Sequence, residues 1–140
     1  MGSGGRYAPI RCGPCHRVKQ FQVTFDCAEP VRVARFWAET LGYQAEHDDE
    51  QGGWAAALDP TGVGPRLYFQ CVPEGKVVKN RVHLDVRIGT GLVGEERLAA
   101  LEAECERLLP LGAERVRLLY DGTDSCIVMQ DIEGNEFCLD

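Results

Sequence analysis

An internal repeat restricts the fold of this chain more than any other feature. A strand pattern, a helix ending in Leu-Gly and an Asp-x-x-Gly turn occur in the first half and return in the same order in the second. These landmarks lie at residues 23–26 and 82–85, 41–42 and 111–112, and 59–62 and 131–134. Three matching landmarks in one order indicate a duplicated unit, and two units are too few for a solenoid.

Each unit contains one helical pattern. The first helix is expected to begin at Pro30, a residue suited to the first helical turn. Its apolar positions recur at helical spacing, as do those of the second helix. They are Ala34, Trp37, Ala38 and Leu41 in the first helix, and Leu98, Leu101, Cys105 and Leu108 in the second. The glycines at 42 and 112 are expected to close the helices in the left-handed conformation.

Short strand candidates surround the two helices. Besides the repeated strands, they cover 43–47, 54–58 and 66–72 in the first half, and 113–119, 126–130 and 136–139 in the second. Each half therefore has the order strand, helix, strand, strand, strand. The sequence predicts an α+β domain of two tandem βαβββ modules that pack together. We place a flexible leader at 1–17 and the domain at 18–140, with module 1 at about 18–75 and module 2 at about 79–140.

Composition excludes several classes of protein. The 140 residues suit one domain, and 44% apolar with 26% charged residues is an ordinary globular balance. A net charge of −7 without a basic stripe argues against nucleic-acid binding. No apolar run is long enough for a membrane span, and the start of the sequence lacks the apolar centre of a signal peptide. We therefore expect a cytoplasmic protein with no membrane partner.

The seven cysteines are an unusual number for such a chain. The segment Cys12-Gly-Pro-Cys15-His16 matches both a thioredoxin redox motif and a c-type haem attachment motif. However, a glycine-rich leader precedes it and a strand follows it, whereas a thioredoxin cysteine begins a helix after a strand. We interpret the motif as part of the leader. The other cysteines are expected to be small core residues, at Cys27, Cys71, Cys105, Cys126 and Cys138.

The repeated strands alternate between polar and apolar residues, which places the two kinds on opposite faces of a sheet. The polar set is Gln20, Gln22, Thr24 and Asp26 in the first strand, and Arg81, His83 and Asp85 in the second. The opposite set is Phe21, Val23 and Phe25, and Val82, Leu84 and Val86. The apolar faces are expected to pack under the helices. The polar faces either line a concave binding site or face solvent.

Five stretches of the sequence resemble one known superfamily. They are the helix 30–43, the segments 69–70, 72–74 and 78–85, and the ending 131–139. Over about residues 18–140, the chain resembles the vicinal oxygen chelate superfamily of glyoxalases, bleomycin-resistance proteins and extradiol dioxygenases, and more narrowly its glyoxalase-like proteins. The resemblance implies a cup-shaped mixed or antiparallel sheet, a small-molecule ligand and a homodimer.

Metal-dependent relatives place one ligand on each of four strands. The resemblance implies that the ligand position of the first strand is Gln22 and that of the fourth strand is Tyr68 or Gln70. The position of the fifth strand is Arg81, with His83 one step inward on the same face. The position of the last strand is Cys138, with Glu136 on the same face. An arginine cannot coordinate a cation, and a cysteine suits softer metals than magnesium or manganese. The resemblance therefore favours a cup without a metal. A shift in register would give the divalent-metal set Gln22, Gln70, His83 and Glu136.

A metal-free cup still offers chemistry. His83 is expected to act as a general base, with Asp85 or Asp26 setting its tautomer, and Arg81 to hold a carboxylate or enolate oxygen. The alternative is a histidine that only satisfies a neighbouring carboxylate. Trp54, Tyr68 and Phe69 would supply stacking surface. The expected substrate-binding residues are Gln22, Thr24, Trp54, Tyr68, Gln70, Asp85 and Cys138.

The resemblance and these candidate residues suggest two functions. The first is a lyase or isomerase that acts on a carbonyl or enolisable substrate. The second is a protein that sequesters an antibiotic or metabolite without changing it, as bleomycin-resistance relatives do. Negative charge and aromatic side chains would suit a planar, cationic ligand.

Overall fold

A computed structural model of the chain describes residues 17–48 and 51–140. The Cys12–Cys15 motif and almost all of the predicted leader lie outside the described residues, so the leader stays a prediction. Among the described residues, no helix has the length and apolar character that crossing a membrane requires.

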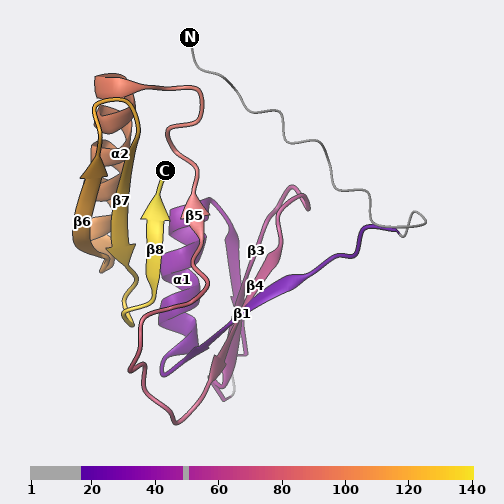
Figure 1. Cartoon of the computed structure of the whole chain (residues 1–140). Helices are drawn as coiled ribbons and strands as arrows, with labels where there is room; N and C mark the ends of the chain where they lie inside the picture. Colours follow the sequence, from indigo (N-terminus) through magenta and orange to yellow (C-terminus); the bar gives the residue numbers. More distant parts are fainter. Residues whose placement is uncertain (1–16, 49–50) are drawn as a thin grey trace.

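The predicted pair of α+β modules is confirmed, and each module forms its own four-stranded sheet (Figure 1). Module 1 comprises β1 (Gln22–Cys27), α1 (Pro30–Leu41), β2 (Gln44–His47), β3 (Trp54–Leu58) and β4 (Arg66–Cys71). Module 2 comprises β5 (Asp85–Val86), α2 (Gly94–Leu108), the 3-10 turn η1 (Leu109–Leu111), β6 (Glu114–Tyr120), β7 (Ser125–Gln130) and β8 (Glu136–Leu139).

Both sheets have the same topology, as expected for a duplication. The strand orders are β1-β4-β3-β2 and β5-β8-β7-β6. The first strand of each module pairs in parallel with the last, and the remaining pairs are antiparallel. Gly42 closes α1 and Gly112 closes η1, the turn that follows α2, both in the left-handed conformation with φ of 71° and 108°. A Cβ at Gly112 would approach the Ile132 side chain to 2.5 Å, so glycine is required there for packing as well as for backbone conformation.

The repeat is less regular at β5 than the sequence predicts. β5 contains only Asp85 and Val86, and residues 81–84 precede it without strand pairing. Val82, which we expected on the buried face, is 80% exposed, and Phe21, expected on the buried face of the first strand, is 70% exposed and precedes β1. β5 pairs with β8 only at Cys138 and Leu139, whereas Glu136 at the start of β8 accepts hydrogen bonds from Asn80 through its side chain and its carbonyl.

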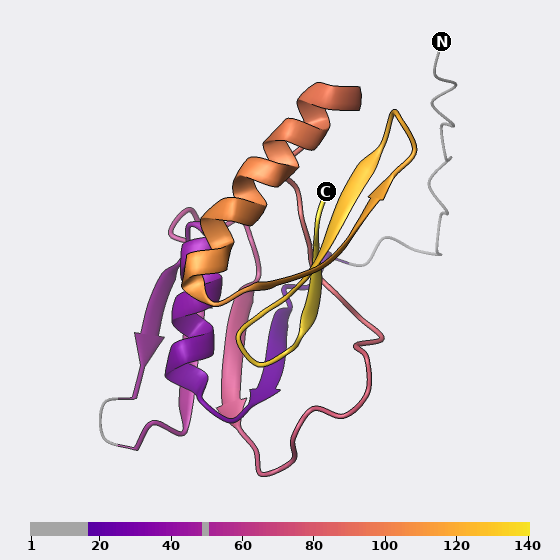
Figure 2. The same cartoon turned by 90° about the vertical axis from the view of Figure 1, so that its left-hand side faces the viewer.

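One aromatic cluster joins the two modules. The rings of Phe36 and Trp37 in α1 lie 6.0 and 5.0 Å from that of Phe137 in β8. On its other side, the Trp37 ring lies 5.5 Å from that of Phe25 in β1. Figure 1 accordingly shows α1 between the sheet of module 1 and β8 of module 2, and Figure 2 shows α2 running beside the β6–β7 hairpin. The helices and the helix-facing strand residues thus form a shared core.

The turn between β7 and β8, residues 131–135, connects module 2 to α1 by hydrogen bonds. The buried Asp131 carboxylate accepts one from the Trp37 indole at 3.0 Å. The Glu133 carboxylate accepts two, from the backbone N–H groups of Ala28 (2.7 Å) and Glu29 (2.9 Å), directly before the first turn of α1. A carboxylate at this position also complements the positive end of the helix dipole. We call residues 131–135 the docking turn.

We predict that Glu133→Ala lowers the free energy of unfolding by about 0.5–2 kcal/mol, the usual cost of losing a carboxylate at a helix start. Glu29→Ala is the matched control, because the Glu29 side chain takes part in an exposed ion pair with Arg32, and such pairs contribute little. Urea unfolding followed by circular dichroism measures both variants. Equal losses in the two would contradict the role of Glu133.

Candidate functional site

A cavity of about 800 Å³ lies between β1 and the segment that links the two modules. We call this segment, residues 72–84, the connector. The wall contains both apolar side chains and charges of both signs. Its polar and charged residues are Thr24, Asp26, Glu74, Lys76, Lys79, Asn80, Arg81, His83, Asn135 and Glu136. This size and mixture suit a small organic ligand.

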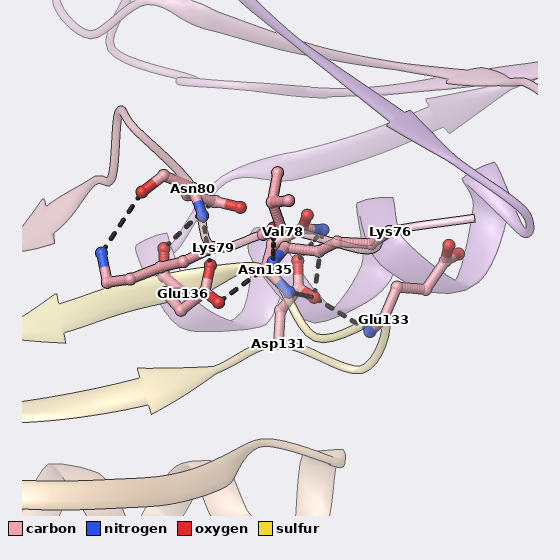
Figure 3. Close-up of polar contacts among 8 residues, drawn as sticks. All are labelled: Lys76, Val78, Lys79, Asn80, Asp131, Glu133, Asn135 and Glu136. Carbon is pink, nitrogen blue, oxygen red and sulfur yellow. Dashed lines mark hydrogen bonds and ion pairs between the residues drawn. The ribbon is translucent and has the colours of Figure 1, made fainter. Parts of the chain in front are cut away.

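Glu136, at the start of β8, holds the connector in place (Figure 3). One carboxylate oxygen accepts from Lys76 Nζ at 3.0 Å, and the other accepts from the backbone N–H of Asn80 at 2.9 Å. Burial raises the pKa of Glu136, but the hydrogen bonds from these two donors have the larger effect, so the pKa lies below its usual range. The cavity wall is therefore fixed to the same strand that follows the docking turn.

His83 and Asp85 form a pair at the cavity. His83 Nδ1 lies 2.7 Å from Asp85 Oδ1, and both side chains are partly exposed. Asp85 is also the register partner of Cys138 on β8. Burial raises the pKa of the Cys138 thiol to about 12, with smaller contributions from the neighbouring Cys126 and Asp85. Ligand atoms of His83, Asp85 and Cys138 all lie within 4.8 Å of one another.

The predicted site residues fall into three groups. Thr24, Arg81 and His83 line the cavity. Asp85 and Cys138 lie next to it, through their contacts with His83. The remaining residues occupy the face of the module 1 sheet that points away from α1; they are Gln22, Trp54, Tyr68 and Gln70. We call this surface the open face of module 1.

The open face of module 1 has its own polar network. Gln22 accepts a hydrogen bond from Arg66 at 3.1 Å, and Gln70 donates one to Asp26 at 2.8 Å. The rings of Trp54 and Tyr68 are stacked with centroids 6.0 Å apart, and the Arg66 guanidinium lies 5.2 Å from the Tyr68 centroid. The stack is a flat aromatic surface beside the cavity.

These contacts disfavour the divalent-metal set suggested by a register shift. Both Glu136 oxygens accept from the connector, and the Gln22 oxygen accepts from a cationic arginine. Among the described His, Cys, Asp and Glu residues, the group close enough to hold an ion is instead His83, Asp85 and Cys138.

Two expectations about individual side chains are wrong. Phe69 is fully buried and lies 5.1 Å from the Phe25 ring, so it belongs to the core and cannot stack on a ligand. Cys71 was expected in the core but is exposed, because it is the last residue of β4. Of the other described cysteines, Cys27 and Cys105 are buried, whereas Cys126 and Cys138 are only half-buried.

The contribution of connector residues to the site was not predicted from the sequence. Lys76 and Asn80 bridge to Glu136, and Lys79 and Asn135 complete the polar wall. Periodicity gives no signal for such residues, because the connector has no regular structure. The available signal was the concentration of lysine and asparagine directly before the His83 strand pattern.

Comparisons with known proteins agree with the family resemblance of the sequence. The sequence model of the glyoxalase-like domain matches residues 22–139. The chain therefore belongs to the glyoxalase-like domain family. Among curated proteins, none matches this sequence.

Solved structures show the same fold at low sequence identity. A glyoxalase/bleomycin resistance protein/dioxygenase family enzyme from Burkholderia phytofirmans is 15% identical, with a TM-score of 0.61 over 84% of this chain and 94% of that one. The fosfomycin resistance protein FosX from Listeria monocytogenes is 13% identical, with a TM-score of 0.63 over 89% and 93%. A point mutant of FosX, solved with Mn(II) and 1S,2S-dihydroxypropylphosphonic acid, is 13% identical and gives 0.62 over 84% and 85%.

We predict that Lys76→Met loosens the connector without unfolding the domain. Losing a charge-assisted hydrogen bond of about 1.5 kcal/mol should speed hydrogen exchange at the Asn80 amide roughly tenfold. Lys79→Met is the matched control, because Lys79 donates to the carbonyl of the adjacent Asn80 and not to Glu136. Unchanged exchange in Lys76→Met, or equal acceleration in both variants, would contradict this role for Lys76.

Proposed function

We propose that this protein binds a small molecule in the cavity and acts as a lyase or isomerase at a carbonyl or enolisable centre. The observation that carries the proposal is the 2.7 Å contact between His83 Nδ1 and Asp85 Oδ1 beside a cavity of ligand size. A carboxylate in this position keeps the proton on Nδ1 and leaves Nε2 as the basic nitrogen.

The proposed step is removal of a proton from carbon next to a carbonyl group. His83 Nε2 accepts the proton, and the electron pair of the C–H bond moves toward the carbonyl oxygen. Arg81, also on the cavity wall, stabilises the negative charge that develops on that oxygen. Return of the proton to a different atom gives an isomerase, and departure of a leaving group from the adjacent carbon gives a lyase.

The proposed chemistry needs a test that does not require the true substrate. Purified protein, stripped of metals by a chelator, is incubated in D₂O with a panel of 2-oxo acids and hydroxyketones. NMR then measures exchange of the C–H beside the carbonyl. Loss of a general base should slow any catalysed exchange about 10²–10⁴-fold in His83→Ala.

The matched control for this experiment is His47→Ala, because His47 lies on β2 and not on the cavity wall. It should exchange at the wild-type rate. Exchange that is equally fast in wild type and His83→Ala, or no exchange above background with any compound, would contradict the proposed base.

The second candidate function is sequestration of a planar ligand without chemistry. The stacked Trp54 and Tyr68 rings support it, since they offer a flat π surface outside the proposed catalytic cavity. The net charge of −7 favours a cationic ligand. The Burkholderia neighbour belongs to a family named in part for bleomycin resistance, which suits an antibiotic as the ligand.

For this candidate we predict that Trp54→Ala reduces the thermal stabilisation that subsaturating planar, cationic antibiotics produce. Loss of one stacking partner should weaken binding by about 0.5–1.5 kcal/mol or more. Tyr120→Ala is the control, because Tyr120 is also a strand aromatic with an exposed ring but lies on β6. Differential scanning fluorimetry gives the shift. Stabilisation of Trp54→Ala as large as that of the wild type would contradict this site.

We further propose a homodimer in the cytoplasm. The open face of module 1 leaves Trp54 and Tyr68 half-buried, and Phe21 and Val63 nearby are largely exposed, so a second copy has apolar surface to cover. The five described cysteines are free thiols, which suits a reducing compartment. Light scattering during gel filtration tests the dimer, which should have twice the 15.5 kDa mass of the chain.

A further inference from the structure

Two cysteines of module 1 lie side by side at one end of its sheet. Cys27 is the last residue of β1 and Cys71 is the last residue of β4, and the two are direct partners in the parallel register. Register partners point to the same face of a sheet, and neighbouring strands lie about 4.8 Å apart. Because a disulfide spans Cα distances of about 4.4–6.8 Å, the backbone already has the spacing that this bond needs.

Both sulfur atoms also point into the gap between the two strands. Cys27 Sγ lies 3.5 Å from the carbonyl oxygen of Gln70, the residue before Cys71. In return, Cys71 Sγ lies 3.5 Å from the carbonyl oxygen of Ala28, the residue after Cys27. Each thiol therefore donates a weak hydrogen bond to the backbone beside the other cysteine, so the side chains as well as the backbone converge.

The two thiols differ in their access to solvent. Cys71 is exposed, whereas Cys27 is only 3% exposed. Burial raises the pKa of the Cys27 thiol to about 12, with smaller contributions from Glu133 and from Cys71 itself. The thiolate is the reactive form of cysteine, and it must be reached by its partner. A reagent in solution therefore reacts first with Cys71, and Cys27 is the thiol that closes the bond.

We propose that Cys27 and Cys71 form a reversible disulfide by exchange with a low-molecular-weight disulfide such as oxidised glutathione. The Cys71 sulfur attacks the small disulfide, gives up its proton to the released thiol and becomes a mixed disulfide. The Cys27 sulfur then attacks the Cys71 sulfur, loses its proton and releases the second small thiol. Two protein thiols are oxidised, and one small disulfide is reduced to two thiols. In reducing compartments such bonds are usually transient and serve to sense redox state.

The disulfide would join two segments that shape the cavity. Val72 begins the connector and lines the cavity, and its backbone N–H donates to the Cys27 carbonyl at 2.9 Å. Next to Cys27, the Ala28 N–H donates to Glu133 of the docking turn. The Val72 amide exchanges with solvent only when the ends of β1 and β4 separate, which the disulfide opposes. The bond does not depend on the proposed function, because Cys27 and Cys71 are not on the cavity wall.

The test uses the full chain with Cys12→Ser and Cys15→Ser, which removes the thiols of the predicted leader. The protein is incubated with oxidised or reduced glutathione, its free thiols are blocked, and tryptic peptides are identified by mass spectrometry without reduction. Trypsin places the two cysteines in separate peptides, 20–32 and 67–76, each with a single cysteine. We expect these peptides to be linked in the oxidised sample alone. Hydrogen exchange at Val72 should be at least about tenfold slower in the linked protein.

Three variants in this background separate the two steps. Cys27→Ala should stop at the mixed disulfide, so that the Cys71 peptide carries one glutathione. Cys71→Ser, which changes an exposed side chain, should leave Cys27 unmodified. The matched control Cys126→Ser, which changes a half-buried strand cysteine of module 2, should keep the link. A parent in which Cys71 stays a mixed disulfide, a link confined to Cys126 and Cys138, a modified Cys27 in Cys71→Ser, or unchanged Val72 exchange in the linked protein would each overturn the proposal.

Discussion

The buried hydrogen bond from Trp37 to Asp131 is the interaction on which the rest of this structure depends. Asp131 is only 2% exposed, and a carboxylate removed from water must be satisfied by donors inside the protein. The Trp37 indole supplies one donor from module 1. The backbone N–H groups of Glu133 and Asn135 and the Asn135 side chain supply the others from the docking turn itself. One carboxylate thus shapes the turn and fixes it against α1.

The position of the cavity follows from this attachment. β8 leaves the docking turn at Glu136, whose carboxylate holds the connector through Lys76 and Asn80. The connector leads to His83, and two residues further β5 pairs with β8 opposite Cys138. A chain of short, specific contacts therefore runs from the inter-module core to the histidine. Duplication supplies two similar modules, and their junction supplies the site.

Much of the fold was predictable because it depends on local periodicity. Pro30 and Gly42 bound α1 as expected, and β3 and β8 have the predicted limits. The main error is the strand expected at 81–86, because β5 pairs with β8 only at Cys138 and Leu139 while Glu136 binds the connector at Lys76 and Asn80. Alternation alone cannot reveal such contacts with a partner strand. Phe69 was misassigned although the alternation of β4 places it with Leu67 on the face opposite Tyr68 and Gln70.

The site was predictable only in part. Alternation brought Thr24, Arg81 and His83 to one cavity, and proximity in sequence suggested the pairing of His83 with Asp85. Alternation did not distinguish the residues that line the cavity from those on the open face of module 1, which are Gln22, Trp54, Tyr68 and Gln70. That separation depends on the path of the irregular connector and on its attachment to Glu136.

The most direct test is a crystal structure with the compound that stabilises the protein most. We expect ligand density in the cavity, in contact with His83 and Arg81. Density confined to the Trp54–Tyr68 stack, with the cavity filled only by solvent, would contradict it.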